Sequence, residues 1–125
     1  KEIILRENII FQAHSVLAGG LLSGKYEVHN GDYAGEGRLS KLKHQTRKLR
    51  DKETLRNYEK LKSFCQENNL QETSLALSFV MSSQFVEEII LGAASINQLE
   101  NLLDAIKNPA SIEQIRSITN LIYPH

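Results

Sequence analysis

Two glycine turns in the sequence have the residue types and spacing of an anion-binding site. In the turn nearer the C-terminus, the apolar run Ile89-Ile90-Leu91 is followed by Gly92 and then by Ser95, with Gln98 three positions later. Ser95 and Gln98 have the spacing of a capping box, which predicts a helix that begins near Ile96. A strand, a glycine turn and a helix N-terminus together present free backbone N–H groups that suit phosphate. Many strand–helix connections share this pattern and bind nothing, so an ordinary connection is the competing interpretation.

The other glycine turn covers residues 14–26 and follows a predicted strand over residues 9–13. Its paired glycines, Gly19 and Gly20, permit backbone conformations that other residues rarely adopt. Lys25 follows directly, where its ammonium could reach a phosphate. From the residues alone, an ordinary solvated lysine is the simpler interpretation.

The charge balance excludes a general electrostatic partner. The chain of 125 residues has 15 basic and 15 acidic side chains, so no net field attracts nucleic acid or a membrane surface. Residues 41–50 contain five Lys or Arg and one His, but no aromatic residue interleaves them, which favours a solvated surface segment over a nucleic-acid site. We expect neither a nucleic-acid nor a membrane partner, and we predict no metal site.

The single cysteine, Cys65, excludes an internal disulfide and fits a reducing compartment, so we expect a cytoplasmic protein. Cys65 lies on the apolar stripe of a predicted helix, capped by Asp51 and ending near Asn68. It is therefore expected to be a small buried residue rather than a nucleophile. No apolar stretch of the sequence reaches membrane-spanning length.

The predicted elements form an incomplete α/β arrangement. After the first strand and glycine turn, residues 27–50 are predicted to be a mobile loop, with turn signals such as Asn30-Gly31. Further helices are expected to begin after the cap Thr73, near Ile96 and after the cap Ser111. The first of these is apolar around much of its girth, and the other two have apolar residues at helical spacing. The strands over 9–13 and 88–91 are separated by helices, which predicts parallel pairing and burial on both faces. Because two strands alone make no stable sheet, we expect one partial domain over residues 1–125, part of a larger α/β fold.

Three stretches of the chain resemble the aldo-keto reductase family. H-S-V-L-A-G-G-L-L-S-G-K-Y, residues 14–26, is similar to the family's Y-S-P-L-A-x-G-x-L-T-G-K-Y loop after the seventh barrel strand. E-T-S-L-A-L-S-F-V, residues 72–80, is similar to its T-x-A-Q-L-A-L-A-W helix. I-I-L-G-A-A-S-I-N-Q-L-E-N-L, residues 89–102, is similar to its segment after the eighth strand. The order and separation of the three stretches also agree with the family.

The resemblance implies the C-terminal part of a (β/α)8 barrel, with the last two β/α units and a C-terminal helix, and with the N-terminal strands missing. It also implies an oxidoreductase that uses NADPH to reduce the carbonyl group of a small molecule. By position, His14 would stack on the nicotinamide. The other residues that the resemblance places at the cofactor's pyrophosphate and adenosine are Ser15, Leu17, Ala18, Gly19, Lys25, Gly92, Ala94, Gln98 and Asn101.

The sequence departs from the family pattern at several of these positions. Ala94 stands where a Ser, Lys or Arg is expected, and the family's Glu-Asn pair falls on Asn101 and Leu102, so hydrogen bonds to the cofactor are lost. The family's catalytic Asp, Tyr, Lys and His belong to earlier strands, and none of them is matched here, so no catalytic residue is assigned. We expect the chain to be inactive without the missing N-terminal half, supplied by the same polypeptide or by another subunit. The alternative is a non-catalytic relative that serves as an interaction or regulatory protein.

Overall fold

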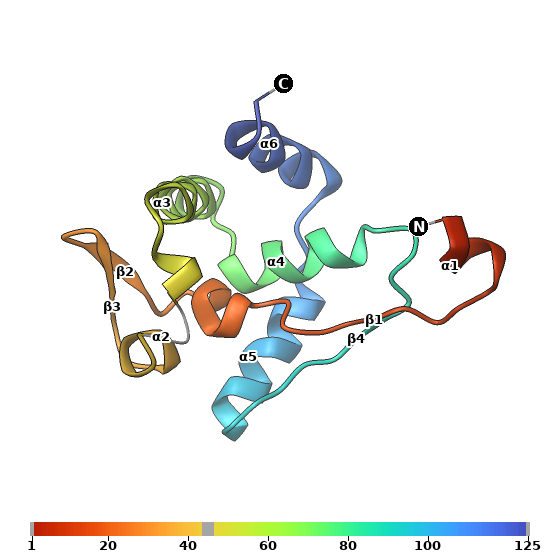
Figure 1. Cartoon of the computed structure of the whole chain (residues 1–125), viewed down its shortest axis with the longest axis horizontal. Helices are drawn as coiled ribbons and strands as arrows, with labels where there is room; N and C mark the ends of the chain where they lie inside the picture. Colours follow the sequence, from red (N-terminus) through yellow and green to blue (C-terminus); the bar gives the residue numbers. More distant parts are fainter. Residues whose placement is uncertain (1, 44–46, 125) are drawn as a thin grey trace.

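The computed structural model describes residues 2–43 and 47–124 (Figure 1). These residues form six α-helices, the first of them at the N-terminus, together with two small sheets and two 3₁₀ turns. In chain order the elements are α1 Glu2–Arg6, β1 Gln12–Ala13, η1 Ala18–Ser23, β2 Glu27–His29, β3 Asp32–Ala34, α2 Arg38–Lys41, η2 Arg47–Arg50, α3 Lys52–Glu67, α4 Glu72–Met81, β4 Glu88–Ile89, α5 Ile96–Lys107 and α6 Ile112–Ile122.

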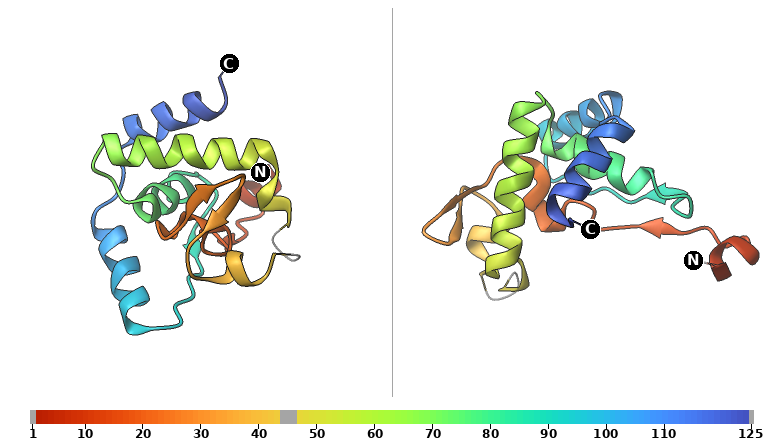
Figure 2. Two further views of the ribbon diagram at one scale, coloured as in Figure 1. Left: turned by 90° about the vertical axis from the view of Figure 1, so that its left-hand side faces the viewer. Right: turned by 90° about the horizontal axis from the view of Figure 1, so that it is seen from above.

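The two predicted strands are neighbours and run parallel, as expected from the helices between them. Gln12 pairs with Glu88 and Ala13 with Ile89, and Ile90 N–H donates to the Ala13 carbonyl at 2.8 Å. The side chains of Gln12 and Glu88 are also hydrogen-bonded across the pair. In Figure 1, β1 and β4 lie side by side at the edge of the helical body, while α1 extends beyond it (Figures 1 and 2).

The predicted burial of these strands on both faces is wrong. Ile90 is 54% exposed and Ile10 is 62% exposed, because the described residues add neither a third strand nor a second layer to this sheet. The paired segments are also shorter than predicted, with two residues each.

Residues 27–50, predicted to be a loop, contain regular structure. β2 and β3 form an antiparallel hairpin in which Val28 pairs with Tyr33, and the predicted turn is present, with φ values of 51° at Asn30 and 74° at Gly31. The sequence did not indicate this hairpin because its strands have only three residues each. The mobility of the segment stays a prediction, and residues 44–46 of the basic stretch lie outside the described residues.

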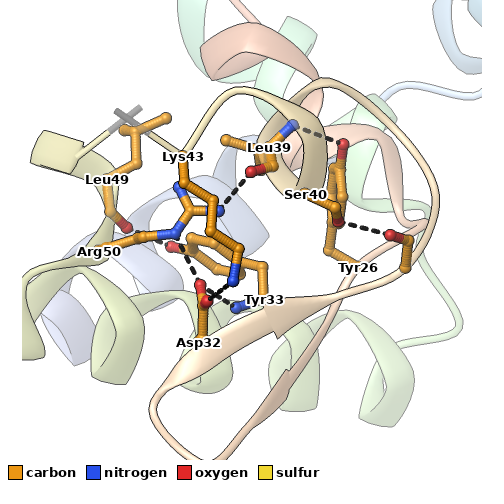
Figure 3. A network of polar contacts seen from close by, with 9 residues as sticks. Tyr26, Asp32, Tyr33, Leu39, Ser40, Lys43, Leu49 and Arg50 are labelled. Carbon is orange, nitrogen blue, oxygen red and sulfur yellow. Dashed lines mark hydrogen bonds and ion pairs between the residues drawn. The ribbon is translucent and has the colours of Figure 1, made fainter. Parts of the chain in front are cut away.

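Ion pairs and hydrogen bonds hold the hairpin against η2 (Figure 3). Asp32 accepts from Lys43 at 2.7 Å and from Arg50 at 2.6 Å, and the Tyr33 hydroxyl donates to the Leu49 carbonyl at 2.6 Å. The hydrogen bond from Lys43 is the largest of the effects that lower the pKa of Asp32 to about 2. Two basic residues of the 41–50 stretch, which was predicted to be a solvated surface segment, are thus engaged by one carboxylate.

The helix boundaries follow the predicted caps with one exception. Asp51 accepts from the N–H groups of the first turn of α3, and Ser95 does the same for α5. Ser111 and Gln114 form a complete capping box at α6. Thr73 is the exception: α4 begins at Glu72 with Gln71 as its N-cap, two residues before the predicted cap, and the Thr73 hydroxyl donates to the Leu22 carbonyl at 3.1 Å instead of capping the helix.

The buried side chains form two clusters, one against the N-terminal half of α3 and one against its C-terminal half. The first joins the hairpin to α3 and contains Leu21, Tyr26, Tyr33, Leu39, Leu55 and Tyr58. The second joins α3, α4 and α6 and contains Cys65, Leu75, Ala110, Ile115 and Ile118. Cys65 is therefore a buried core residue, as predicted, with 2% of its surface exposed. Burial raises the pKa of its thiol to about 12.

The apolar stripe of α5 is mostly exposed. Leu102 and Ala105 are buried against α4, but Ile96 is 77% exposed and Leu99, Leu103 and Ile106 are each more than 40% exposed. An apolar helix face of this kind normally packs against another element. None of the helices among the described residues has the length and hydrophobicity needed to cross a membrane.

Candidate functional site

The glycine turn after β1 has a strained, left-handed backbone at successive positions. The φ angles of Ser15 and Ala18 are 57° and 49°, and those of Gly19 and Gly20 are 67° and 99°. Left-handed conformations are unusual for Ser and Ala, and they cluster at ligand-binding turns. This turn leaves the sheet at the end of β1, where His14 and Ser15 are also hydrogen-bonded, with 3.0 Å between Nδ1 and Oγ.

The same turn leaves backbone donors available. The N–H groups of Ala18 and Gly20 donate to the Ser15 and Leu17 carbonyls, both at 2.9 Å. Within the described part of the chain, the N–H groups of Val16 and Leu17 make no hydrogen bond. Adjacent unbonded N–H groups in a curved backbone are suited to binding an anion.

Lys25 lies over this turn rather than extending freely into solvent. Its Nζ is 5.3 Å from the centre of the Tyr26 ring, and a Cβ placed on Gly20 would lie 3.7 Å from that Nζ. No carboxylate among the described residues forms an ion pair with it. The ammonium is thus positioned beside the glycine turn, but Lys25 is an exposed residue, so its contact with a phosphate stays a prediction.

The second glycine turn, at Gly92, leads into a helix whose N-terminus is capped by its own side chains. Ser95 Oγ accepts from the Gln98 N–H at 3.2 Å, and Gln98 Oε1 accepts from the Ala94 N–H at 2.8 Å. Gln98, predicted to contact the cofactor, therefore holds the helix start. An anion that binds at this helix N-terminus has to accept hydrogen bonds from N–H groups other than those of Ala94 and Gln98, or displace the Gln98 side chain.

A polar cavity of about 720 Å³ connects the first glycine turn to α5. Asn101, predicted at the adenosine end, lines it from α5, and Ser23 and Gly24 line it from the glycine turn. The other lining residues come from α3, α4, α5 and the connection between α3 and α4: Lys62, Cys65, Gln66, Asn69, Leu70, Gln71, Glu72, Thr73, Ser74, Asp104 and Asn108. Of the ten predicted cofactor residues, Asn101 lines this cavity and the other nine do not, so the cavity does not bring the two glycine turns together.

Two side chains of this cavity have orphaned polar atoms. Glu72 and Ser74 are 8% and 1% exposed, and Glu72 Oε2 and Ser74 Oγ lack a hydrogen-bond partner among the described residues. Burial raises the pKa of the Glu72 carboxyl, against the opposing effects of the Tyr58 hydroxyl and the Lys62 charge. Sequence analysis missed both residues, although a glutamate at the start of an apolar helix was an available signal.

A comparison with protein families identifies the chain. Residues 1–122 match the model of the aldo/keto reductase family. The chain belongs to the aldo/keto reductase family. A search of curated proteins found no match to it. Membership supports an oxidoreductase-type function, in a family that generally uses NAD(P)H.

The cofactor of an aldo/keto reductase fits one of the two turns better than the other. At the first turn, the free N–H groups of Val16 and Leu17 and the ammonium of Lys25 suit a pyrophosphate. At the second turn, Gly92 and Ala94 are exposed, but the Gln98 side chain occupies the Ala94 N–H. Leu102, at the position of the family's Asn, is 6% exposed and is part of the packing against α4.

Tyr33 and Tyr58 of this aldo/keto reductase chain are unsuited to acid–base catalysis. A catalytic tyrosine needs a lowered pKa, but burial raises the pKa of Tyr33 to about 12 and also raises that of Tyr58. The Tyr58 hydroxyl donates to the Tyr26 carbonyl at 2.8 Å, so it holds the loop in place. Across residues 2–43 and 47–124, no group of His, Cys, Asp and Glu could bind a metal ion.

Proposed function

We propose that this chain is the dinucleotide-binding part of an NADP(H)-dependent aldo/keto reductase, which interconverts a small-molecule carbonyl and its alcohol. In this proposal the chain contributes the last two β/α units and the C-terminal helix of a (β/α)8 barrel. The substrate site and the catalytic residues belong to the remaining strands, in the same polypeptide or in another subunit. The lone buried cysteine favours the cytoplasm as its location.

The observation that carries the proposal is the parallel pairing of β1 with β4. Because the strands are parallel neighbours, both glycine turns leave the sheet at its carboxyl end, which is where barrels and open α/β sheets bind their ligands. A cavity that reaches from the first turn to α5 then offers room for the adenosine end of a dinucleotide.

The exposed apolar surface favours the proposal that further strands of a barrel pack against this chain. The edges of the two-stranded sheet are open in the described residues, and Ile10, Phe11 and Ile90 are each more than one-third exposed. Isolated two-stranded sheets are only marginally stable, and open edges tend to pair with further strands. Strands of the missing half would pair with these edges and cover these side chains.

The residues of this chain would bind and orient the dinucleotide. The N–H groups of Val16 and Leu17 would donate to a pyrophosphate oxygen, and Lys25 would neutralise part of its charge. His14, at the end of β1, would stack on the nicotinamide ring. When bound, the dinucleotide supplies the hydride that reduces a carbonyl carbon. The chain itself would hold the dinucleotide in place for that transfer.

A fluorescence titration of the purified chain with NADPH tests the proposal. Saturation with a Kd below about 1 mM is expected, which corresponds to about −4 kcal/mol of binding free energy. Lys25→Met is expected to weaken binding about tenfold, the effect of losing one charge-assisted hydrogen bond. Lys52→Met, which removes an exposed lysine at the start of α3, is the matched control and leaves binding unchanged. No saturation, or an equal loss in both variants, contradicts the proposal.

The second candidate is a non-catalytic relative that serves as an interaction protein. The burial of Leu102 favours it, because a leucine packed against α4 cannot donate to adenine. The same titration separates the two functions, since an interaction protein does not bind NADPH saturably.

A further inference from the structure

We propose that the polar cavity beside the start of α4 is a binding site for a small organic cation, a polar molecule with a primary ammonium group. Glu72 and Ser74, on the α4 wall of the cavity, would hold the ammonium. Asn101, the one predicted cofactor residue that lines the cavity, lies on the α5 wall instead. The inference therefore does not rest on the proposed function, and its tests use no dinucleotide.

The first argument is that two buried polar atoms of the cavity wall lack a hydrogen-bond partner. Glu72 is 8% exposed and Ser74 is 1% exposed, and within residues 2–43 and 47–124 neither Glu72 Oε2 nor Ser74 Oγ is hydrogen-bonded. Buried polar atoms of folded proteins are nearly always hydrogen-bonded, so two unpaired atoms on one cavity wall indicate a missing partner. A carboxylate oxygen only accepts hydrogen bonds, and a primary ammonium has three N–H donors. A bound cation would supply the donors that the chain lacks at this position.

The second argument is the charge of the cavity. Among the described residues, its lining includes one base, Lys62, and two acids, Glu72 and Asp104. Lys62 forms an ion pair with Glu27 of β2, and its Nζ also donates to the Tyr26 carbonyl at 2.7 Å. The pair of Lys62 and Glu27 is neutral as a unit, so the cavity has a net negative charge when both of its acids are ionised.

Asp104 is held in place by neutral groups. Its Oδ2 accepts from Gln71 Nε2 at 2.9 Å, and its Oδ1 accepts from Asn108 Nδ2 at 3.1 Å. Neither amide neutralises the carboxylate, and none of the ion pairs between described residues includes Asp104. Both acids would therefore attract a cation, and the attraction is stronger beside a buried carboxylate than in open water.

The third argument is the size and the polarity of the cavity. Its volume of about 720 Å³ is that of a pocket for a small molecule. Besides the charged residues, hydroxyl and amide side chains line it: Ser23, Gln66, Asn69, Gln71, Thr73, Asn101 and Asn108. Such groups both donate and accept hydrogen bonds, so they suit a cation that also has hydroxyl groups rather than an apolar chain.

Titration of the full chain with ethanolamine, followed by the NMR chemical shifts of its backbone amides, tests the proposal. Ethylene glycol is the matched neutral probe, because it has a hydroxyl group in place of the ammonium. Ethanolamine is expected to bind saturably near neutral pH and at least about tenfold more tightly than ethylene glycol, the effect of one charge-assisted hydrogen bond. The largest shifts are expected for residues 69–74, around the start of α4.

Two variants of the α4 wall separate binding from folding. Glu72→Gln keeps the shape of the side chain but removes its charge, so ethanolamine should bind it no more tightly than ethylene glycol does. Ser74→Ala removes a hydroxyl whose Oγ has no partner in the described part of the chain, so it should keep the stability of the fold and weaken ethanolamine binding about threefold to tenfold. Glu59→Gln, at an exposed position of α3 outside the cavity lining, is the matched control and should leave binding unchanged.

The pH dependence of ethanolamine binding is a third measurement. Burial raises the pKa of the Glu72 carboxyl, and only its ionised form attracts a cation. Binding should therefore strengthen as the pH rises through the pKa of Glu72 and weaken below it. The other titratable groups around Glu72 are Tyr58, Lys62 and Cys65 of α3, Glu27 of β2 and Asp104 on the α5 wall. Glu72→Gln should remove the Glu72 part of the dependence and so separate it from that of Glu27 and Asp104.

Three outcomes would overturn the proposal. The first is equal affinity for ethanolamine and ethylene glycol, and the second is equal ethanolamine binding in the Ser74→Ala and Glu59→Gln variants. The third is that neither probe binds saturably, which would mean that water alone pairs with Glu72 and Ser74. Because the NADPH titration is a separate experiment, none of these outcomes decides the proposed function.

Discussion

The hairpin side of the molecule and the β1–β4 side differ in how fully their apolar side chains are buried. On the hairpin side, Tyr26 and Leu39 have no exposed surface and Tyr33 has 4%. On the β1–β4 side, Ile10 and Ile96 are each more than 60% exposed. Isoleucine is at least as apolar as tyrosine, so the hydrophobicity of the side chains does not explain the difference. The hairpin side buries its apolar side chains among the described residues, whereas the β1–β4 side leaves them exposed, where the proposed further strands would cover them.

The two sides also differ in the roles of their residues: the hairpin side stabilises the fold, and the β1–β4 side carries the proposed binding groups. The ion pairs of Asp32 tie the hairpin to Lys43 and to Arg50 of η2 (Figure 3). Glu27 pairs with Lys62 of α3, and the Tyr58 hydroxyl of α3 donates to the Tyr26 carbonyl. The other side contributes open strand ends, unbonded N–H groups and a helix start. A rigid support beside an open edge is a common arrangement for a binding site.

The largest expected effect is on the hairpin side, at Gly37. Its φ is +153°, and an added Cβ would overlap the Tyr26 hydroxyl and lie 2.8 Å from Lys25 Nζ. Gly37→Ala is therefore expected to lower the free energy of unfolding by about 2–4 kcal/mol, from backbone strain and a displaced buried ring. Urea unfolding measures this change.

Gly19→Ala is the matched control, because Gly19 also has a positive φ, of +67°, but nothing lies within 4 Å of the added Cβ. It should cost about 1 kcal/mol from the backbone conformation alone. Equal losses in the two variants would show that the packing around Tyr26 is not tight.

The next effect is a loss of hairpin stability in acid. Ion pairs and hydrogen bonds from Lys43 and Arg50 hold the folded-state pKa of Asp32 at about 2, below the value of about 4 expected for the unfolded chain. A lowered folded-state pKa stabilises the fold fully above the unfolded value, and this contribution is lost as the pH falls from about 4 to about 2. Urea midpoints measured over this range should fall.

Asp32→Asn should remove the part of this acid dependence that comes from the hairpin. Asp104→Asn, on α5, is the matched control and should leave that part in place. A pH profile that is identical in the unmodified chain and in Asp32→Asn would contradict the role of the Asp32 ion pairs.

The smallest effect is expected on the exposed stripe of α5. Leu99 is 49% exposed, so Leu99→Ser should change the free energy of unfolding by less than about 0.5 kcal/mol. Leu55→Ser, at a position that is 6% exposed in the first core cluster, should cost several-fold more. A large loss in Leu99→Ser would show that the stripe is already covered in the isolated chain, and the contrast between the two sides would be lost.

Local patterns in the sequence were sufficient for the starts of α3, α5 and α6 and for the strand pairing, but not for the start of α4. Asp51, Ser95 and Ser111 cap the helices they were predicted to cap, because a cap depends on residues two or three positions apart. The parallel pairing followed from the helices between two apolar runs, and the family followed from three motifs. Each of these features depends on neighbours in the sequence or on chain connectivity.

Tertiary structure decided which of these residues are buried and which form the site. The stripe of α5 has the same helical spacing as that of α3, but α3 packs on two clusters and α5 mainly on α4. The positions of Lys25 over the glycine turn and of Glu72 in the polar cavity depend on residues tens of positions away. Burial and electrostatic environment are properties of the packed chain, so the pattern of residues along the sequence could not determine them.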